Sequence, residues 1–102
     1  MINSTPQQFR DFRDLSTVLR SGVVTVEDDD CQVELWERAG CLYAYIRDDA
    51  EEHHRKCPVI IWLFDLRQST PAAPHVAMKL NDDETFVNDV FWERCQEWLV
   101  TP

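Results

Sequence analysis

The sequence has only two glycines, Gly22 and Gly40, among its 102 residues. Phosphate-binding loops, and the sharp turn that exposes a catalytic serine in many hydrolases, need closely spaced glycines because the backbone there adopts unusual angles or closely approaches a ligand. Two widely separated glycines build neither motif, so the sequence gives no support for a nucleotide-binding loop or a serine-hydrolase turn.

Positive charge is also scarce, since 19 acidic residues stand against 10 lysines and arginines and give a net charge of -9. Nucleic acids and anionic membrane surfaces are bound through basic surfaces, so we expect neither as a direct partner. No apolar run reaches the roughly 18 residues that a membrane-spanning helix needs. The first ten residues lack the apolar segment of a signal peptide. We therefore expect a cytoplasmic protein whose four cysteines are thiols.

Hydrophobic residues are plentiful at 44% of the chain, with four tryptophans, five phenylalanines and two tyrosines. This composition can fill a core without help from disulfides or metal, and the length suits one domain over residues 1–102.

Helical patterns lie at the two ends of the chain. Residues 4–22 repeat apolar positions at helical spacing, with Thr5 as N-cap, Pro6 in the first turn and Gly22 at the end. Residues 81–100 form the second pattern, where Asn81 and Glu84 make a capping box.

Strand patterns occupy the middle of the chain, over residues 23–27, 31–38, 41–47, 58–66 and 75–80. Turn residues separate neighbouring strands, which favours antiparallel pairing. The sequence predicts a single α+β domain, an antiparallel β-meander of about five strands flanked by an N-terminal and a C-terminal helix.

The clearest pairing is the hairpin of residues 31–47, with its tip at Ala39–Gly40. One face of this hairpin is aliphatic and belongs on the core. The other face carries aromatic and charged side chains, namely Trp36, Tyr43, Tyr45, Glu34, Arg38 and Arg47. Aromatic residues beside arginine are typical of interaction hot spots, which favours a partner-binding surface or a homodimer contact. The alternative is that a helix covers this face and makes the aromatics part of the core.

Acidic residues gather in two clusters that a meander would place at one end of the sheet. They are Asp28, Asp29 and Asp30 after the first strand, and Asp48, Asp49, Glu51 and Glu52 after the third. Neither cluster has the alternating ligands and glycine of a calcium loop. We interpret them as an acidic edge that binds a protein with a basic surface; the alternative is a solvated rim.

The segment "HHRKC" (53–57) places His53, His54 and Cys57 together. A zinc site needs further ligands, and the remaining Cys and His residues form no Cys-x-x-Cys pair. Cys57 precedes Pro58 at a predicted strand start, without a helix N-terminus to lower its pKa. We therefore predict no metal, no cofactor and no catalytic residue, and interpret the segment as a charged connection.

The function that these patterns favour is a non-enzymatic, acidic protein-binding module. By analogy of size and charge, it would inhibit a nucleic-acid-binding or toxic enzyme, as phage anti-defence, anti-CRISPR-like or immunity-type proteins do. The order of elements is loosely similar to that of type III secretion chaperones, acidic α+β dimers, which implies an escort protein as an alternative. A small Cys/His metal-dependent hydrolase and a subunit with a permanent aromatic interface are further alternatives.

Overall fold

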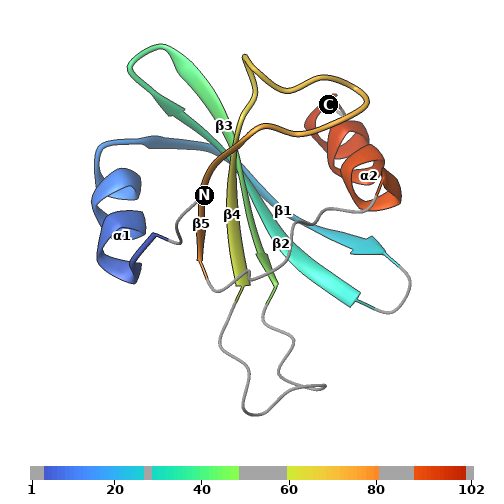
Figure 1. Ribbon diagram of the computed structural model, residues 1–102, viewed down its shortest axis with the longest axis horizontal. Helices are drawn as coiled ribbons and strands as arrows, with labels where there is room; N and C mark the ends of the chain where they lie inside the picture. Colours follow the sequence, from blue (N-terminus) through green and yellow to red (C-terminus); the bar gives the residue numbers. More distant parts are fainter. Residues whose placement is uncertain (1–3, 27–28, 49–59, 81–88, 101–102) are drawn as a thin grey trace.

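The computed structural model describes residues 4–26, 29–48, 60–80 and 89–100. Five antiparallel strands form one sheet in sequence order, and one helix packs on each face (Figure 1). The strands are β1 (Thr17–Val26), β2 (Asp29–Arg38), β3 (Cys41–Asp48), β4 (Ile60–Asp65) and β5 (Val76–Leu80), and the helices are α1 (Pro6–Asp14) and α2 (Asp89–Val100). The predicted α+β meander is confirmed.

The first helix begins as expected and ends much earlier. Thr5 caps α1 in a reciprocal capping box with Gln8, and Pro6 occupies the first turn. The helix ends at Asp14 rather than near Gly22, and β1 already begins at Thr17. Residues 17–26 are rich in β-branched side chains and pair with β2, so the strand ladder overrides the helical spacing.

The hairpin register was predicted correctly. Leu35 pairs with Ala44, and Trp36 pairs with Tyr43. Ala39 and Gly40 both have positive φ, at 53° and 80°, as a two-residue type I′ turn requires. This turn matches the twist of the strands, which explains why a local signal was sufficient here.

Two separate clusters of buried side chains lie on the two faces of the sheet. Helix α2 covers the first, formed by Val24, Cys31, Val33, Ala44, Ile46, Trp62, Phe64, Phe91, Trp92 and Cys95. Helix α1 covers the second, formed by Phe9, Trp36, Ile61 and Leu63, with Phe12, Tyr43, Tyr45, Met78 and Leu80 packed around it. The strong apolar run in β4 serves both, since Phe64 and Leu63 point to opposite faces.

Gly22 takes a role that differs from the predicted helix end. It lies in β1 opposite Val33, and Trp98 of α2 packs directly over it. A β-carbon at this position would collide with the Trp98 indole, so the glycine allows α2 to approach β1 closely.

Several predicted features lie outside the described residues. These are the Asn81–Glu84 capping box with the first part of the last helix, and Pro58 and Val59 ahead of β4. In the described part of the chain, neither helix has the length and apolar character needed to cross a membrane.

Candidate binding surfaces

The aromatic face of the hairpin lies under α1. Trp36 is 0% exposed and stacks on Tyr45, with ring centroids 4.6 Å apart. Phe12 of α1 packs against Trp36 at 6.2 Å and meets Tyr43 edge-on at 5.0 Å. Trp36 is therefore a core residue and is not available on the surface, which corrects its predicted place on an exposed partner-binding face. Tyr43 and Tyr45 are half-buried, and their contact with a partner stays a prediction.

Glu34 is held by internal contacts. Its Oε1 accepts a hydrogen bond from Trp36 Nε1 at 2.8 Å, and its Oε2 accepts one from Ser21 Oγ at 3.3 Å. Arg13 Nε lies 3.8 Å from Oε1. Ser21 pairs with Glu34 across β1 and β2, so the strand register places these groups together. Glu34 therefore provides the hydrogen-bond acceptor for the buried Trp36 indole N–H. This structural role is additional to the part in partner binding that was predicted for Glu34.

A groove of about 460 Å³ lies beside α1 on the same face of the sheet. The apolar part of its lining is formed by Phe9, Trp36, Ile61 and Leu80. All four belong to the cluster of buried side chains under α1 or pack against that cluster. The other lining residues of the groove are Pro6, Arg10, Arg13, Gln32, Glu34, Tyr45 and Arg47. Sequence reasoning placed Arg47 beside Tyr45 and missed the groove, because Arg10 and Arg13 come from a helix whose packing the sequence does not reveal.

Tyr45 contributes a hydroxyl to this groove. Burial raises the pKa of Tyr45 above its ordinary value, and Arg47, which is hydrogen-bonded to it, partly opposes that rise. The phenol is therefore neutral near pH 7 and can donate or accept a hydrogen bond.

The acidic clusters are partly described. Asp29 and Asp30 begin β2, and Asp48 ends β3, at the same end of the sheet (Figure 1). Asp30 is exposed and accepts a hydrogen bond from Thr25 Oγ1, whereas Asp48 is half-buried. The common location is thus as expected for these three aspartates. The other members, Asp28, Asp49, Glu51 and Glu52, lie outside the described residues.

The cysteines that the structure describes are free thiols. Cys31 and Cys95 are buried, and Cys41 is half-buried. Burial raises the pKa of Cys95 to about 12, and nearby Cys31 adds to the rise, so this thiol stays neutral and weakly nucleophilic. No group of three or more potential ligands could hold a metal within 4–26, 29–48, 60–80 and 89–100. His53, His54 and Cys57 lie outside those ranges.

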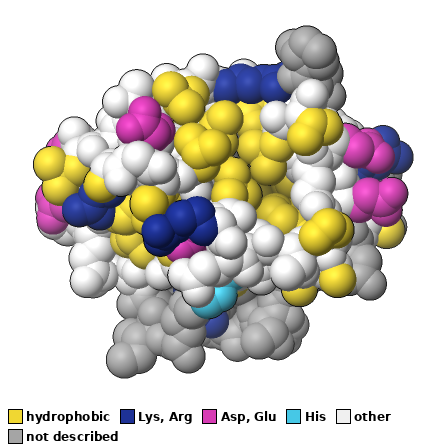
Figure 2. All heavy atoms as spheres, turned by 90° about the horizontal axis from the view of Figure 1, so that it is seen from above, with side chains coloured by type: hydrophobic (Ala, Val, Ile, Leu, Met, Phe, Trp, Pro, Cys, Tyr) yellow, Lys and Arg dark blue, Asp and Glu magenta, His cyan; other side chains and the backbone are white. Residues whose placement is uncertain are grey.

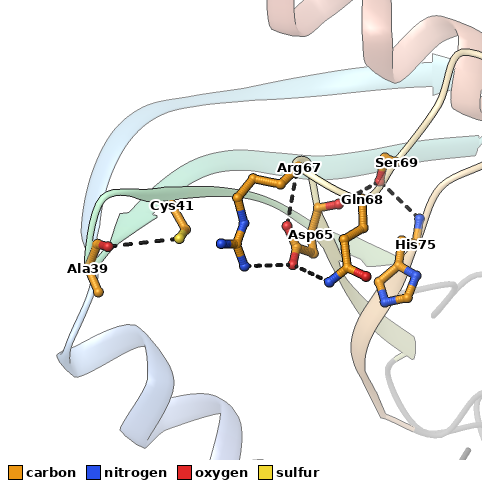
Figure 3. Close-up of polar contacts among 7 residues, drawn as sticks. All are labelled: Ala39, Cys41, Asp65, Arg67, Gln68, Ser69 and His75. Carbon is orange, nitrogen blue, oxygen red and sulfur yellow. Dashed lines mark hydrogen bonds and ion pairs between the residues drawn. The ribbon is translucent and has the colours of Figure 1, made fainter.

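Asp65 organises the corner between β4 and β5 (Figure 3). It is 4% exposed, and its carboxylate accepts hydrogen bonds from the Arg67 backbone, the Arg67 guanidinium and the Gln68 amide. The Arg67 and Gln68 side chains hold the pKa of Asp65 below its ordinary value.

Ser69 and His75 complete this corner through the main chain. Ser69 Oγ donates to the Asp65 carbonyl oxygen at 2.7 Å and accepts from the His75 backbone N–H at 2.9 Å. These hydrogen bonds therefore fix the loop between β4 and β5. They do not align the His75 imidazole with the Ser69 hydroxyl, as a catalytic Ser-His-Asp triad would require.

Hydrophobic side chains also gather in the middle of the face seen from above (Figure 2). In Figure 1 this end of the molecule carries the hairpin tip, the loop after β4 and the C-terminal end of α2. Leu42 and Val100 belong to these segments and are 40% and 80% exposed.

Compared with protein families, with curated proteins and with solved structures, the chain shows no significant match. In the described part of the chain, two polar surfaces are candidates for binding: the sheet end that carries Asp30 and Asp48, and the groove beside α1.

Proposed function

We propose that the protein is a non-enzymatic acidic module that binds a protein partner through the end of the sheet where β2 begins and β3 ends. The observation that carries this proposal is the common location of Asp29, Asp30 and Asp48 in a chain of net charge -9. Carboxylates that gather at one end produce a local negative potential, which accelerates encounter with a basic surface and orients it.

The partner that fits this chemistry is an enzyme with a basic groove for nucleic acid, or a basic toxic enzyme. An acidic module seated in such a groove would compete with phosphate groups and inhibit the enzyme. A phage anti-defence, anti-CRISPR-like or immunity-type inhibitor works in this way. A cytoplasmic location fits the three free thiols of the described residues.

The test compares two variants that remove the same amount of negative charge. Asp30→Asn with Asp48→Asn changes the proposed surface, whereas Glu93→Gln with Glu97→Gln changes α2. The wild-type chain is used to capture partners from nuclease-treated host lysate at low salt, and association with the purified partner is then measured for each variant.

We expect a basic, nucleic-acid-binding partner that high salt releases, and a slower association rate for the Asp30/Asp48 variant than for the Glu93/Glu97 variant. Equal rates for the two variants would mean that net charge alone attracts the partner, and the proposed surface would be wrong. A bait that captures no partner would instead direct attention to His53, His54 and Cys57 as an enzymatic site.

A further inference from the structure

We propose that the groove beside α1 binds a small organic anion, a molecule with a flat apolar body and one negatively charged head group. The proposal is independent of the acidic sheet end, because it concerns other residues on the face of the sheet that α1 covers.

The charge of the groove is opposite to that of the protein. Arg10, Arg13 and Arg47 line it, and among the lining residues that the structure describes Glu34 is the single carboxylate. Arg10 and Arg13 stand three residues apart on α1, so they share one side of the helix. Arg47 comes from β3, so the cationic groups are contributed by two different elements.

The contacts of Arg10 and Arg13 leave their positive charge available. Arg13 Nε lies 3.8 Å from Glu34 Oε1, which is longer than a direct hydrogen bond, and that oxygen already accepts from Trp36 Nε1. Arg10 donates to the neutral Gln7 Oε1 at 2.9 Å. Neither contact is a close ion pair, so an anionic head group would gain charge-assisted hydrogen bonds here.

Arg47 and the Tyr45 hydroxyl lie together at one wall of the groove. Arg47 is hydrogen-bonded to Tyr45, whose hydroxyl is protonated near pH 7, since the ordinary tyrosine pKa is about 10 and burial raises the pKa of Tyr45 further. A head group that reaches Arg47 would therefore meet a cation and a neutral hydroxyl donor at one wall of the groove.

The apolar part of the groove suits the body of such a ligand. Phe9, Ile61, Leu80 and the half-buried Tyr45 line it, and Tyr45 is held in place by stacking on Trp36, which is itself 0% exposed and offers no surface to a ligand. Its volume of about 460 Å³ falls within the range of small-molecule sites and is too small for a folded partner. Apolar walls with a few convergent polar groups favour an amphipathic anion over a bare inorganic ion.

The probes are 1-naphthylacetate and 1-naphthylacetamide, which share size and shape and differ in charge. Each is titrated into the ¹⁵N-labelled full-length protein at millimolar concentration, with shifts followed by two-dimensional NMR. We expect 1-naphthylacetate to shift the amides of Gln32, Arg47 and Ile61, and to bind about tenfold or more tightly than the amide, since one charge-assisted hydrogen bond is worth about that much.

Variants then assign the head-group site. Arg13→Gln and Arg47→Gln should each weaken binding of 1-naphthylacetate several-fold. If Arg47→Gln does not fold, Arg10→Gln on the exposed side of α1 provides a further test. The matched control is Arg94→Gln, an exposed arginine of α2 on the other face, which should bind like the wild type.

Four outcomes would overturn the proposal. Equal affinity for the charged and neutral probes would make the groove a simple apolar depression. Shifts that map away from α1 and β3, or no shift at millimolar probe, would refute the site. An acidic peptide that binds in the groove far more tightly than 1-naphthylacetate would show that the occupant is a protein segment.

Discussion

The two faces of the sheet are closed by helices in different ways. On the α2 side, Phe64, Ile46 and Cys95 are at most 1% exposed, and Phe64 meets Trp92 edge-on at 5.4 Å. On the α1 side, the aromatic stack around Trp36 is bordered by Glu34 and by a groove with three arginines.

Helix length is one reason for this difference. The nine residues of α1 span about 14 Å, against about 18 Å for the twelve residues of α2 and about 33 Å for a ten-residue strand such as β2, so α1 covers less of its face of the sheet. Such a face must keep polar groups near water, whereas a closely covered face can fill with aromatic and sulfur side chains. One meander thus carries a closely packed core under α2 and an open groove beside α1.

The largest effect should separate the two faces directly. Phe64→Ala removes a fully buried ring between β4 and α2 and should cost about 3–5 kcal/mol of unfolding free energy. Phe12→Ala removes a half-buried ring of α1 and should cost about 1–2 kcal/mol, since much of its area already meets water. Urea denaturation followed by circular dichroism measures both values. If Phe12→Ala is as damaging as Phe64→Ala, the α1 face is packed as tightly as the α2 face.

A smaller effect should follow from adding one methyl group on the α2 side. Gly22→Ala places a β-carbon against the Trp98 indole, 2.9 Å from Cε2, so either the ring or α2 must move. We expect a loss of about 1–3 kcal/mol, reduced slightly because alanine is otherwise better than glycine in a strand.

The control for Gly22→Ala is a double-mutant cycle. Trp98→Phe shortens the ring and should make the added methyl group less costly, so the double variant should be more stable than the sum of the two single changes. Independent, additive effects would show that Trp98 is not what excludes the methyl group.

The smallest effect concerns the polar part of the α1 side. Glu34→Ala leaves the Trp36 indole N–H without its acceptor beneath α1 and should cost about 1–2 kcal/mol. Glu34→Gln keeps an oxygen acceptor and should cost clearly less. Chemical denaturation of both variants, with Glu93→Gln as the exposed control, tests this order. Equal losses for Glu34→Ala and Glu34→Gln would assign the effect to the Arg13 ion pair instead.

Sequence reasoning was most successful where the signal was local. The register of the hairpin follows from the Ala39–Gly40 turn and the alternation beside it, and both were read correctly. It failed over residues 15–22, where the apolar spacing suits a helix, although the strand that begins at Thr17 continues into the β-branched residues 23–26. Pairing with β2 decided that segment, and a one-dimensional pattern does not contain the partner strand.

The two candidate sites also differ in whether a local sequence signal could predict them. The acidic sheet end was predictable for Asp29, Asp30 and Asp48, because strand order alone brings consecutive hairpin ends together. The groove beside α1 was not, since it joins Arg10 and Arg13 to Arg47 across a helix–sheet contact.

The sequence by itself determined the meander, the hairpin register and the acidic end, because alternation and turn residues act over a few neighbouring positions. The tertiary structure decided which helix covers which face, how Trp36 became buried, and how three arginines line one groove in an acidic protein. These features depend on the packing of distant elements, whose free energy is a property of the whole fold and not of any local stretch.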